Sequence, residues 1–168
     1  DGLGYEVDRH LPEDEIGRFS NETAHSVTLS KDFYVGVFEI TQAQYENVMG
    51  ENPSRYEGDS RPVETVSWNK VRGGTWPSGS PSASSFAGLL SEKCGRSFEL
   101  PTEAQWEYAC RAGTETALNS GLNLTTPAYC PNLDLLGWYT YNSFEEKHRE
   151  VGDKTPNGKS CFKRDIRR

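Results

Sequence analysis

The sequence has no long hydrophobic run and few histidines. Nowhere in its 168 residues is there an apolar stretch long enough for a membrane-spanning helix. There are three histidines, His10, His25 and His148, and none belongs to a recognisable motif with a serine or cysteine nucleophile. Triad chemistry therefore has no support in the sequence, and His25 is expected to be structural.

Basic residues are too few for a protein that binds nucleic acid. The chain has 18 Lys and Arg against 25 Asp and Glu, a net charge of −7 and a pI near 5.0. This balance excludes nucleic acid and an anionic membrane surface as the main partner. The chain begins at Asp1 with no signal-peptide pattern, so we expect that the true N-terminus is not shown. The compartment stays unknown, and an extracytoplasmic one stays open.

The four cysteines show no zinc-binding spacing. No C-x-x-C pair is present, and Cys161 has no second cysteine within five residues. Cys94 and Cys110 fall on expected helices, and we interpret them as buried free thiols. A disulfide among Cys94, Cys110 and Cys130 is the alternative if the protein is exported.

The pattern of residues divides the chain into three parts. Residues 1–24 are polar and glycine-rich and are expected to be irregular. From His25 the pattern changes to short apolar runs, and because the chain is long enough for one domain, residues 25–158 are expected to form it, with mostly loop after Gly113. Residues 159–168, KSCFKRDIRR, are basic and without periodicity, which indicates a disordered tail or a segment outside the domain.

Several short elements can be predicted within the domain. Val27 and Leu29 alternate with polar residues, and residues 33–40 (FYVGVFEI) are β-branched and aromatic, so two strands are expected there. A helix is predicted from Thr41, which forms a capping box with Gln44, to about Met49. Further helices are predicted from Trp68, capped by Ser67, and over residues 82–93, closed by Gly95.

Residues 98–113, FELPTEAQWEYACRAG, predict a strand, a sharp turn and a helix. Pro101 ends the strand because it cannot donate to a sheet. Thr102 and Gln105 complete a second capping box, and Gly113 is expected to close the helix in a left-handed conformation. Trp106 is predicted to lie in the core.

Taken in order, these motifs resemble the formylglycine-generating enzyme (sulfatase-modifying factor) family. The matching pieces span residues 11–157 and include HSV at 25–27, DFYVG at 32–36, EITQAQY at 39–45, NPS at 52–54, RPVETVSW at 61–68, LPTEAQWEYA at 100–109, RAG at 111–113, VG at 151–152 and PN at 156–157. The resemblance implies an α+β, C-type-lectin-like fold, with short twisted strands, a few helices and much ordered loop. It covers only the N-terminal portion of that family's pattern, so the fold is expected to be incomplete.

The resemblance also implies an activity, but this chain lacks residues that the activity needs. Family members oxidise a substrate cysteine to formylglycine with copper, using a cysteine pair in a later half. Here residues 159–168 stand where that half would begin, and no such pair is seen. Arg72-Gly73-Gly74 does not correspond to the family's late RGG strand. No residue is therefore assigned to catalysis or to copper.

Two candidate sites remain. Asn132 and the backbone of Leu133 lie about where a family calcium site starts, with Asp134 and Asn142 as nearby oxygen donors. An ordinary loop is the alternative for these residues. Trp76 lies in a loop rich in Gly, Pro and Ser and is the tryptophan expected to be exposed and to contact a ligand.

Three hypotheses follow for the function. The chain could be a copper-dependent oxidase of sulfatase-type polypeptides, but it lacks the cysteine pair that this needs. It could be a non-catalytic module of the same fold, from a bacterium, that binds a protein or glycan with calcium. It could also be a truncated or frame-shifted piece of a full domain, whose unpaired edges would favour self-association.

Overall fold

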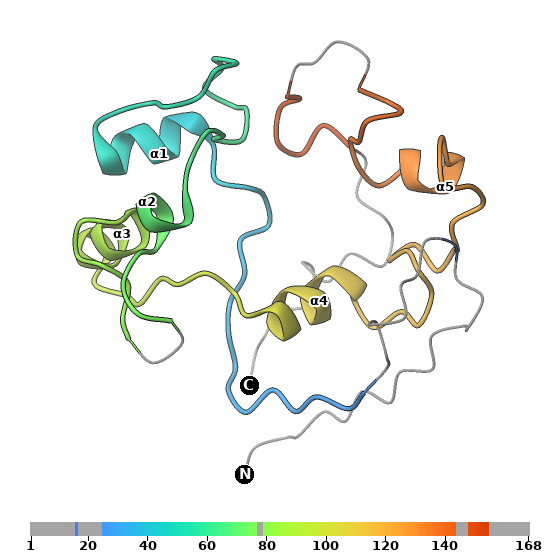
Figure 1. Cartoon of the computed structure of the whole chain (residues 1–168), viewed down its shortest axis with the longest axis horizontal. Helices are drawn as coiled ribbons and strands as arrows, with labels where there is room; N and C mark the ends of the chain where they lie inside the picture. The colour runs from blue at the N-terminus through green and yellow to red at the C-terminus, as the bar shows by residue number, and fades with distance from the viewer. Residues whose placement is uncertain (1–15, 17–24, 77–78, 144–147, 155–168) are drawn as a thin grey trace. The chain divides into compact units, whose positions relative to one another are not determined.

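The computed structural model describes residue 16 and residues 25–76, 79–143 and 148–154, which contain five helices joined by long loops (Figure 1). The chain divides into two compact units. Unit 1 takes in the chain up to Val37, Pro101–Glu146 and the chain from Lys154 on. Unit 2 takes in Phe38–Leu100 and Lys147–Asp153.

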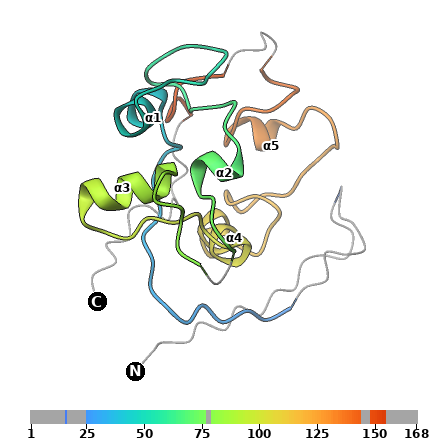
Figure 2. The same ribbon diagram turned by 60° about the vertical axis from the view of Figure 1, so that its left-hand side comes forward.

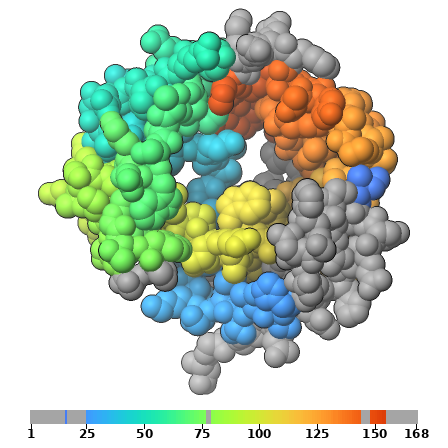
Figure 3. Space-filling view, viewed as in Figure 1, coloured from blue at the N-terminus to red at the C-terminus, as the bar shows by residue number. Residues whose placement is uncertain are grey.

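Unit 2 is built from three helices, α1 (Gln42–Met49), α2 (Trp68–Val71) and α3 (Phe86–Cys94). Helix α3 lies beside α1 and α2, as two views of the ribbon show (Figures 1 and 2). Its buried contact is a stacked pair of rings, Tyr45 from α1 on Phe86 from α3, with centroids 5.2 Å apart. In the space-filling view the cyan and green atoms of this unit form one continuous mass (Figure 3).

The predicted caps of α1 and α2 are confirmed. The Thr41 hydroxyl accepts from the Gln44 amide at 3.2 Å, and Thr41 N donates to Gln44 Oε1 at 3.0 Å. Gly50 ends α1 with a left-handed φ of 77°. Ser67 caps α2 through the Lys70 amide. These local bonds satisfy helix-end groups that would otherwise lack partners.

Helix α3 starts four residues later than residues 82–93 predict. Ser85 is its N-cap, accepting from Gly88 N at 3.2 Å, and the Ser85 hydroxyl also donates to Ser82 O at 2.7 Å. The chain from Ser82 to Ser85 therefore forms a turn held by the capping serine. The closing residue, Gly95, is as predicted, with φ 62°.

A buried glutamine organises the loop that follows α1. The side chain of Gln42 is fully buried, and all four of its hydrogen-bonding positions are used. Nε2 donates to Tyr56 O at 3.0 Å and to Pro62 O at 3.3 Å. Oε1 accepts from Asn52 Nδ2 at 3.0 Å and from Gly58 N at 2.9 Å. One side chain thus holds four points of the loop over residues 52–62.

Gly88 is needed in α3 because another part of the chain lies against it. A Cβ atom at this position would be 2.1 Å from Ser82 O, which is backbone and cannot move aside cheaply. We expect Gly88→Ala to destabilise unit 2 by about 1–3 kcal/mol, although alanine is the better helix former. Denaturant unfolding measures this change. Gly137→Ala is the control, since nothing lies within 4 Å of its Cβ position; equal effects of the two variants would contradict the prediction.

Unit 1 contains α4 (Glu103–Arg111) and α5 (Pro131–Asp134). The predicted capping box of α4 is confirmed, with the Thr102 hydroxyl accepting from Gln105 N at 3.2 Å and Thr102 N donating to Gln105 Oε1 at 2.9 Å. The C-terminal cap differs from the prediction. Ala112, with φ 54°, takes the left-handed position and Gly113 follows with φ 80°.

The predicted burial of three side chains on α3 and α4 is wrong. Trp106 is 59 % exposed rather than in the core. Cys94 and Cys110 are free thiols, as expected, but both are exposed. The helix α4 has no buried residue, and its apolar stripe is only partly covered, with Tyr108 meeting the Phe33 ring edge to face at 6.4 Å. The pattern of spacing located the stripe, but spacing alone does not supply the element that buries it.

The predicted strands do not form among the described residues. Their one pairing feature is an isolated antiparallel bridge between Thr41 and Pro62. Residues 33–40 carry large exposed apolar side chains instead, and Tyr34 is 85 % exposed. β-propensity reports a fit to a pleated, partly buried surface, which requires a neighbouring strand. The C-type-lectin-like fold and the 25–158 domain limits therefore stay predictions.

Two further predictions concern the ends of the chain. Apart from Ile16, residues 1–24 lie outside the described part, and so do residues 159–168 with Cys161. None of the described helices is long and apolar enough to cross a membrane.

Candidate functional site

Trp76, the predicted ligand-contact residue, is half-exposed and lies against a buried arginine. Its side chain is 43 % exposed, and the guanidinium carbon of Arg72 is 5.0 Å from the centre of its ring. Trp68, on α2, lies 5.5 Å from the same carbon and is 44 % exposed. Two half-exposed indoles thus lie against one guanidinium, and cation–π attraction stabilises both contacts. We call Trp68, Arg72 and Trp76 the tryptophan pair site.

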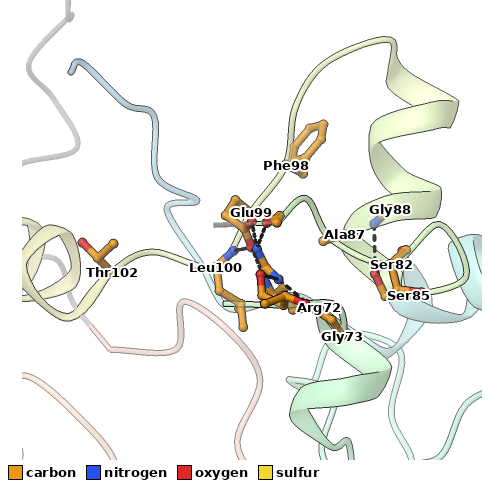
Figure 4. A network of polar contacts seen from close by, with 12 residues as sticks. Arg72, Gly73, Ser82, Ser85, Ala87, Gly88, Phe98, Glu99, Leu100 and Thr102 are labelled. Carbon is orange, nitrogen blue, oxygen red and sulfur yellow. Dashed lines mark hydrogen bonds and ion pairs between the residues drawn. The ribbon is translucent and has the colours of Figure 1, made fainter. Parts of the chain in front are cut away.

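Arg72 is held by an ion pair with two hydrogen bonds. The residue is 1 % exposed, Nε donates to Glu99 Oε1 at 3.0 Å, and Nη2 donates to Glu99 Oε2 at 2.9 Å (Figure 4). The planar guanidinium can form two parallel hydrogen bonds to one carboxylate, which a lysine ammonium cannot do. Glu99 Oε1 also accepts from Leu100 N at 2.9 Å, so the carboxylate is itself fixed.

The loop that carries Trp76 wraps around the same guanidinium. Arg72 Nη1 donates to Gly73 O at 2.8 Å and to Thr75 O at 3.3 Å, and Nη2 donates to Gly79 O. Gly74, with φ 70°, allows this close approach, because a Cβ there would be 2.6 Å from Ser80 O. The glycines of the R-G-G sequence thus serve a tight loop, and the loop fixes the place of Trp76.

The residues predicted to begin a calcium site lie on α5 in unit 1. Asn132 Nδ2 donates to Asn123 O at 2.8 Å. The carbonyl of Leu133 accepts from Leu136 N at 3.0 Å and Gly137 N at 3.2 Å. Asn132 therefore presents its amide nitrogen to the neighbouring loop, and the Leu133 oxygen already serves the turn after α5.

The other two oxygen donors of this prediction, Asp134 and Asn142, are in direct contact. Asn142 Nδ2 donates to Asp134 Oδ1 at 2.6 Å and to Gly137 O at 2.9 Å. A cation is also supplied by the chain, because Lys154 Nζ lies 3.4 Å from Asp134 Oδ1. The hydrogen bond from Asn142 and then the Lys154 ammonium hold the pKa of Asp134 below its usual value.

Cys130, at the N-terminus of α5, is a buried free thiol. The Thr125 hydroxyl lies 3.5 Å from its Sγ, and hydrogen bonds from Thr125 and from backbone groups lower the thiol pKa to about 7. Its own backbone is bracketed by Tyr139, whose hydroxyl accepts from Cys130 N at 2.8 Å and donates to Cys130 O at 3.2 Å. The thiol therefore belongs to a tightly bonded turn and has no access to solvent.

Three residues of these sites were not singled out by the sequence. Arg72 and Lys154 are usually exposed residue types, and Glu99 lies in what was expected to be a strand. A signal was present for Arg72, because Trp68 and Trp76 stand four residues before and four residues after it. Lys154 gave no such signal, since its partner Asp134 is twenty residues away.

Comparison with known proteins identifies the family. Residues 5–160 match the sulfatase-modifying factor enzyme 1-like domain. The chain belongs to this family. Among curated proteins, the chaperone protein LppX of Paenibacillus barcinonensis is 31 % identical over 150 residues, covering 76 % of this chain and 50 % of LppX. The chain thus spans about half the length of this relative. No solved structure matches this chain.

The sulfatase-modifying-factor family is associated with metal ions. The described residues of this chain contain no group of three or more His, Cys, Asp or Glu side chains that could hold a metal ion. At the predicted calcium position the acceptor oxygens already face N–H donors and the Lys154 ammonium. Calcium, which needs six to eight oxygen ligands, does not fit this arrangement as it stands.

Proposed function

We propose that this chain is a ligand-recognition part of a sulfatase-modifying-factor protein, and that it binds an extended polypeptide without oxidising it by itself. The observation that carries the proposal is the tryptophan pair site. Family membership points to a polypeptide ligand, because the family resemblance implies action on sulfatase chains. The name of the relative LppX, a chaperone protein, points the same way.

The tryptophan pair site has the properties of a contact surface. Indole rings supply large amphipathic area, and they are enriched where proteins bind one another. Trp68 and Trp76 each keep more than two fifths of their surface exposed, yet both rest on the fixed guanidinium of Arg72. Side chains that are already ordered lose little entropy on binding, so this pair is prepared for a ligand.

Binding of a cysteine-containing sulfatase-type peptide tests the proposal. We expect Trp76→Ala to raise the dissociation constant about thirtyfold, since truncation of a tryptophan that carries much of the binding energy costs about 2 kcal/mol and each 1.4 kcal/mol is a factor of ten. Isothermal titration calorimetry measures the change. Trp106→Ala is the matched control, because Trp106 is more exposed but belongs to α4. Unchanged affinity in Trp76→Ala, or an equal loss in Trp106→Ala, would rule out this contact surface.

A glycan is the second candidate ligand, and the same indoles support it, because an exposed aromatic face also packs on sugar rings. Titration with oligosaccharides in place of the peptide separates the two. The oxidase hypothesis has its own test: the peptide is incubated with the protein and copper(I), and formation of an aldehyde is followed. We expect no aldehyde from these residues alone. Formation of the aldehyde would show that the chain is catalytic.

The C-type-lectin-like fold is proposed together with this function. It is supported by family membership and by loops that are ordered through buried polar side chains, Gln42 and Arg72 in unit 2. Such a fold presents loops rather than a regular face to its ligand. The Trp76 loop is of this kind.

A further inference from the structure

We propose that residues 148–153 are a strap over a second polypeptide-binding surface of unit 2, and that a partner polypeptide of the same pattern can take the strap's place. The strap lies within the Lys147–Asp153 piece of unit 2, whereas the chain before and after that piece belongs to unit 1. The surface under the strap consists of Phe38, Tyr56 and Ser60, and we call it the receiving surface. None of these residues belongs to the tryptophan pair site, so the proposal stands apart from that site.

Two contacts hold the first part of the strap. The imidazole ring of His148 stacks on the phenol ring of Tyr56, with ring centres 5.7 Å apart and an interplanar angle of 25°. Three residues later, Val151 N donates to Ser60 O at 2.9 Å. Any polypeptide has backbone N–H groups, and many carry ring side chains. A partner with a ring and a backbone donor at this spacing can therefore make both contacts.

A turn at Gly152 completes the pattern. A Cβ atom at this position would be 2.9 Å from Cε1 of the Phe38 ring, so the backbone of the strap lies directly against that ring. The φ angle of Gly152 is 76°, which glycine adopts without strain. The pattern that fits the receiving surface is thus a ring side chain, a backbone N–H three residues later, and a glycine at the next position.

The receiving surface is held in place by contacts that do not involve the strap. The carbonyl of Tyr56 accepts from Gln42 Nε2 at 3.0 Å, and the Tyr56 amide donates to Glu64 Oε1 at 2.9 Å. Next to Ser60, the carbonyl of Arg61 accepts from the backbone amide of Gln42 at 2.9 Å. The loop therefore keeps its bonds when the strap leaves. A surface that is already ordered loses little entropy when a ligand binds.

The strap itself is held at the surface of the unit. No residue from His148 to Asp153 is buried, and His148, Glu150, Gly152 and Asp153 are exposed. Release of the strap therefore uncovers little apolar area. As part of the same chain, the strap meets the receiving surface at an effective concentration of about a millimolar. A partner must exceed that competition through further contacts, and the Phe38 ring, which is 57 % exposed, offers area for them.

NMR titration of the full chain with a peptide tests the proposal. The peptide has the sequence of residues 148–153, HREVGD, with blocked ends. We expect it to shift the amide signals of Tyr56 and Ser60 in His148→Ala, whose own strap has lost its ring contact. The wild type should bind the peptide about tenfold more weakly, since a strap that leaves the surface free in about one molecule in ten lowers the apparent affinity by that factor.

Two more variants of the strap accompany this titration. Gly152→Ala disturbs the contact with Phe38 and should bind the peptide as His148→Ala does. Glu150→Ala is the matched control, because Glu150 is an exposed strap residue outside the contacts with the receiving surface, and it should bind as the wild type does. Gly58 N donates to Gln42 Oε1 at 2.9 Å, so its signal shows that the loop is intact in each variant.

Variants of the two surfaces show where the peptide binds. Added to His148→Ala, Tyr56→Ala should abolish binding, whereas Trp76→Ala should leave it unchanged. A loss of binding with Trp76→Ala but not with Tyr56→Ala would place the peptide at the tryptophan pair site and overturn the proposal. So would equal affinities of the wild type and both weakened variants, or the absence of any shift at Tyr56 and Ser60 in both of them.

Discussion

Gln42→Glu is expected to destabilise unit 2 by roughly 3 kcal/mol at neutral pH, although it replaces a single NH₂ group by an oxygen. The wild-type Nε2 donates to Tyr56 O and Pro62 O from a fully buried position. An ionised carboxylate in its place would direct an acceptor at two carbonyl oxygens. A protonated one has a single O–H, so one of the two carbonyls would still lose its partner.

The effect should depend on pH with a definite sign. Burial beside two carbonyls would raise the pKa of the introduced carboxyl above its unfolded value. The folded protein then binds a proton that the unfolded chain releases, so the destabilisation grows as the pH rises above the unfolded pKa. We expect the loss of unfolding free energy in Gln42→Glu to be smallest below about pH 4, which is near the ordinary pKa of a free glutamate.

Urea unfolding followed by circular dichroism measures this, and hydrogen exchange of the Gly58 amide reports on the loop. Gln44→Glu is the matched control, because it makes the same change two residues along α1. There a carboxylate can still accept from Thr41 N, since Glu and Gln both serve in a capping box. If Gln42→Glu unfolds at the same urea concentration as Gln44→Glu, the four bonds of Gln42 do not hold the loop.

Arg72→Met should cost about 3 kcal/mol of unfolding free energy, which is the lower end for breaking a buried ion pair. The lower end applies because the Glu99 side chain is 35 % exposed and can regain water. The carbonyls of Gly73, Thr75 and Gly79 also lose their donor, so the Trp76 loop should loosen. Peptide binding should weaken with it. Arg72→Lys should recover only part of the loss, since an ammonium cannot form the two-pronged contact with Glu99.

Lys70→Met provides the control for Arg72→Met. Lys70 precedes Arg72 by two residues and forms an ion pair with Glu51 at 2.5 Å, but both of its members are more than half exposed. Such surface pairs contribute little to stability, and its removal should leave the unfolding midpoint unchanged. Equal losses in the two variants would show that burial of Arg72 is not what makes its ion pair important.

The features that the sequence predicted well are local ones. Both capping boxes, Thr41 with Gln44 and Thr102 with Gln105, are present because each needs only residues three apart in the chain. The Ser67 cap and the glycine after α3 are confirmed for the same reason. The exposed position of Trp76 could also be inferred, because a loop rich in Gly, Pro and Ser has no second apolar residue to cover an indole.

Features that depend on distant partners were not predicted. Trp106 has the spacing of a core residue, but no described element covers it, and it is exposed. Residues 33–40 have the composition of a strand, but a strand needs a neighbour to pair with. Nothing in the sequence near Arg72 or Gln42 indicates that they are buried, because their partners, Glu99 and the loop over residues 52–62, lie far along the chain. Burial of a polar side chain follows from its partners, which the local pattern does not contain.

Unit 2 is discontinuous in sequence, and this has a consequence for the order in which the chain can fold. Its last piece, Lys147–Asp153, is separated from Leu100 by most of unit 1, yet Val151 N donates to Ser60 O at 2.9 Å. During synthesis on the ribosome the first piece of unit 2 must wait for about fifty more residues before this bond can form. During that time the early intermediate would lack the segment Lys147–Asp153 and its hydrogen bond to Ser60. A rearranged chain in which residues 147–153 are moved to stand directly before residue 38 would remove the wait, and it should refold faster.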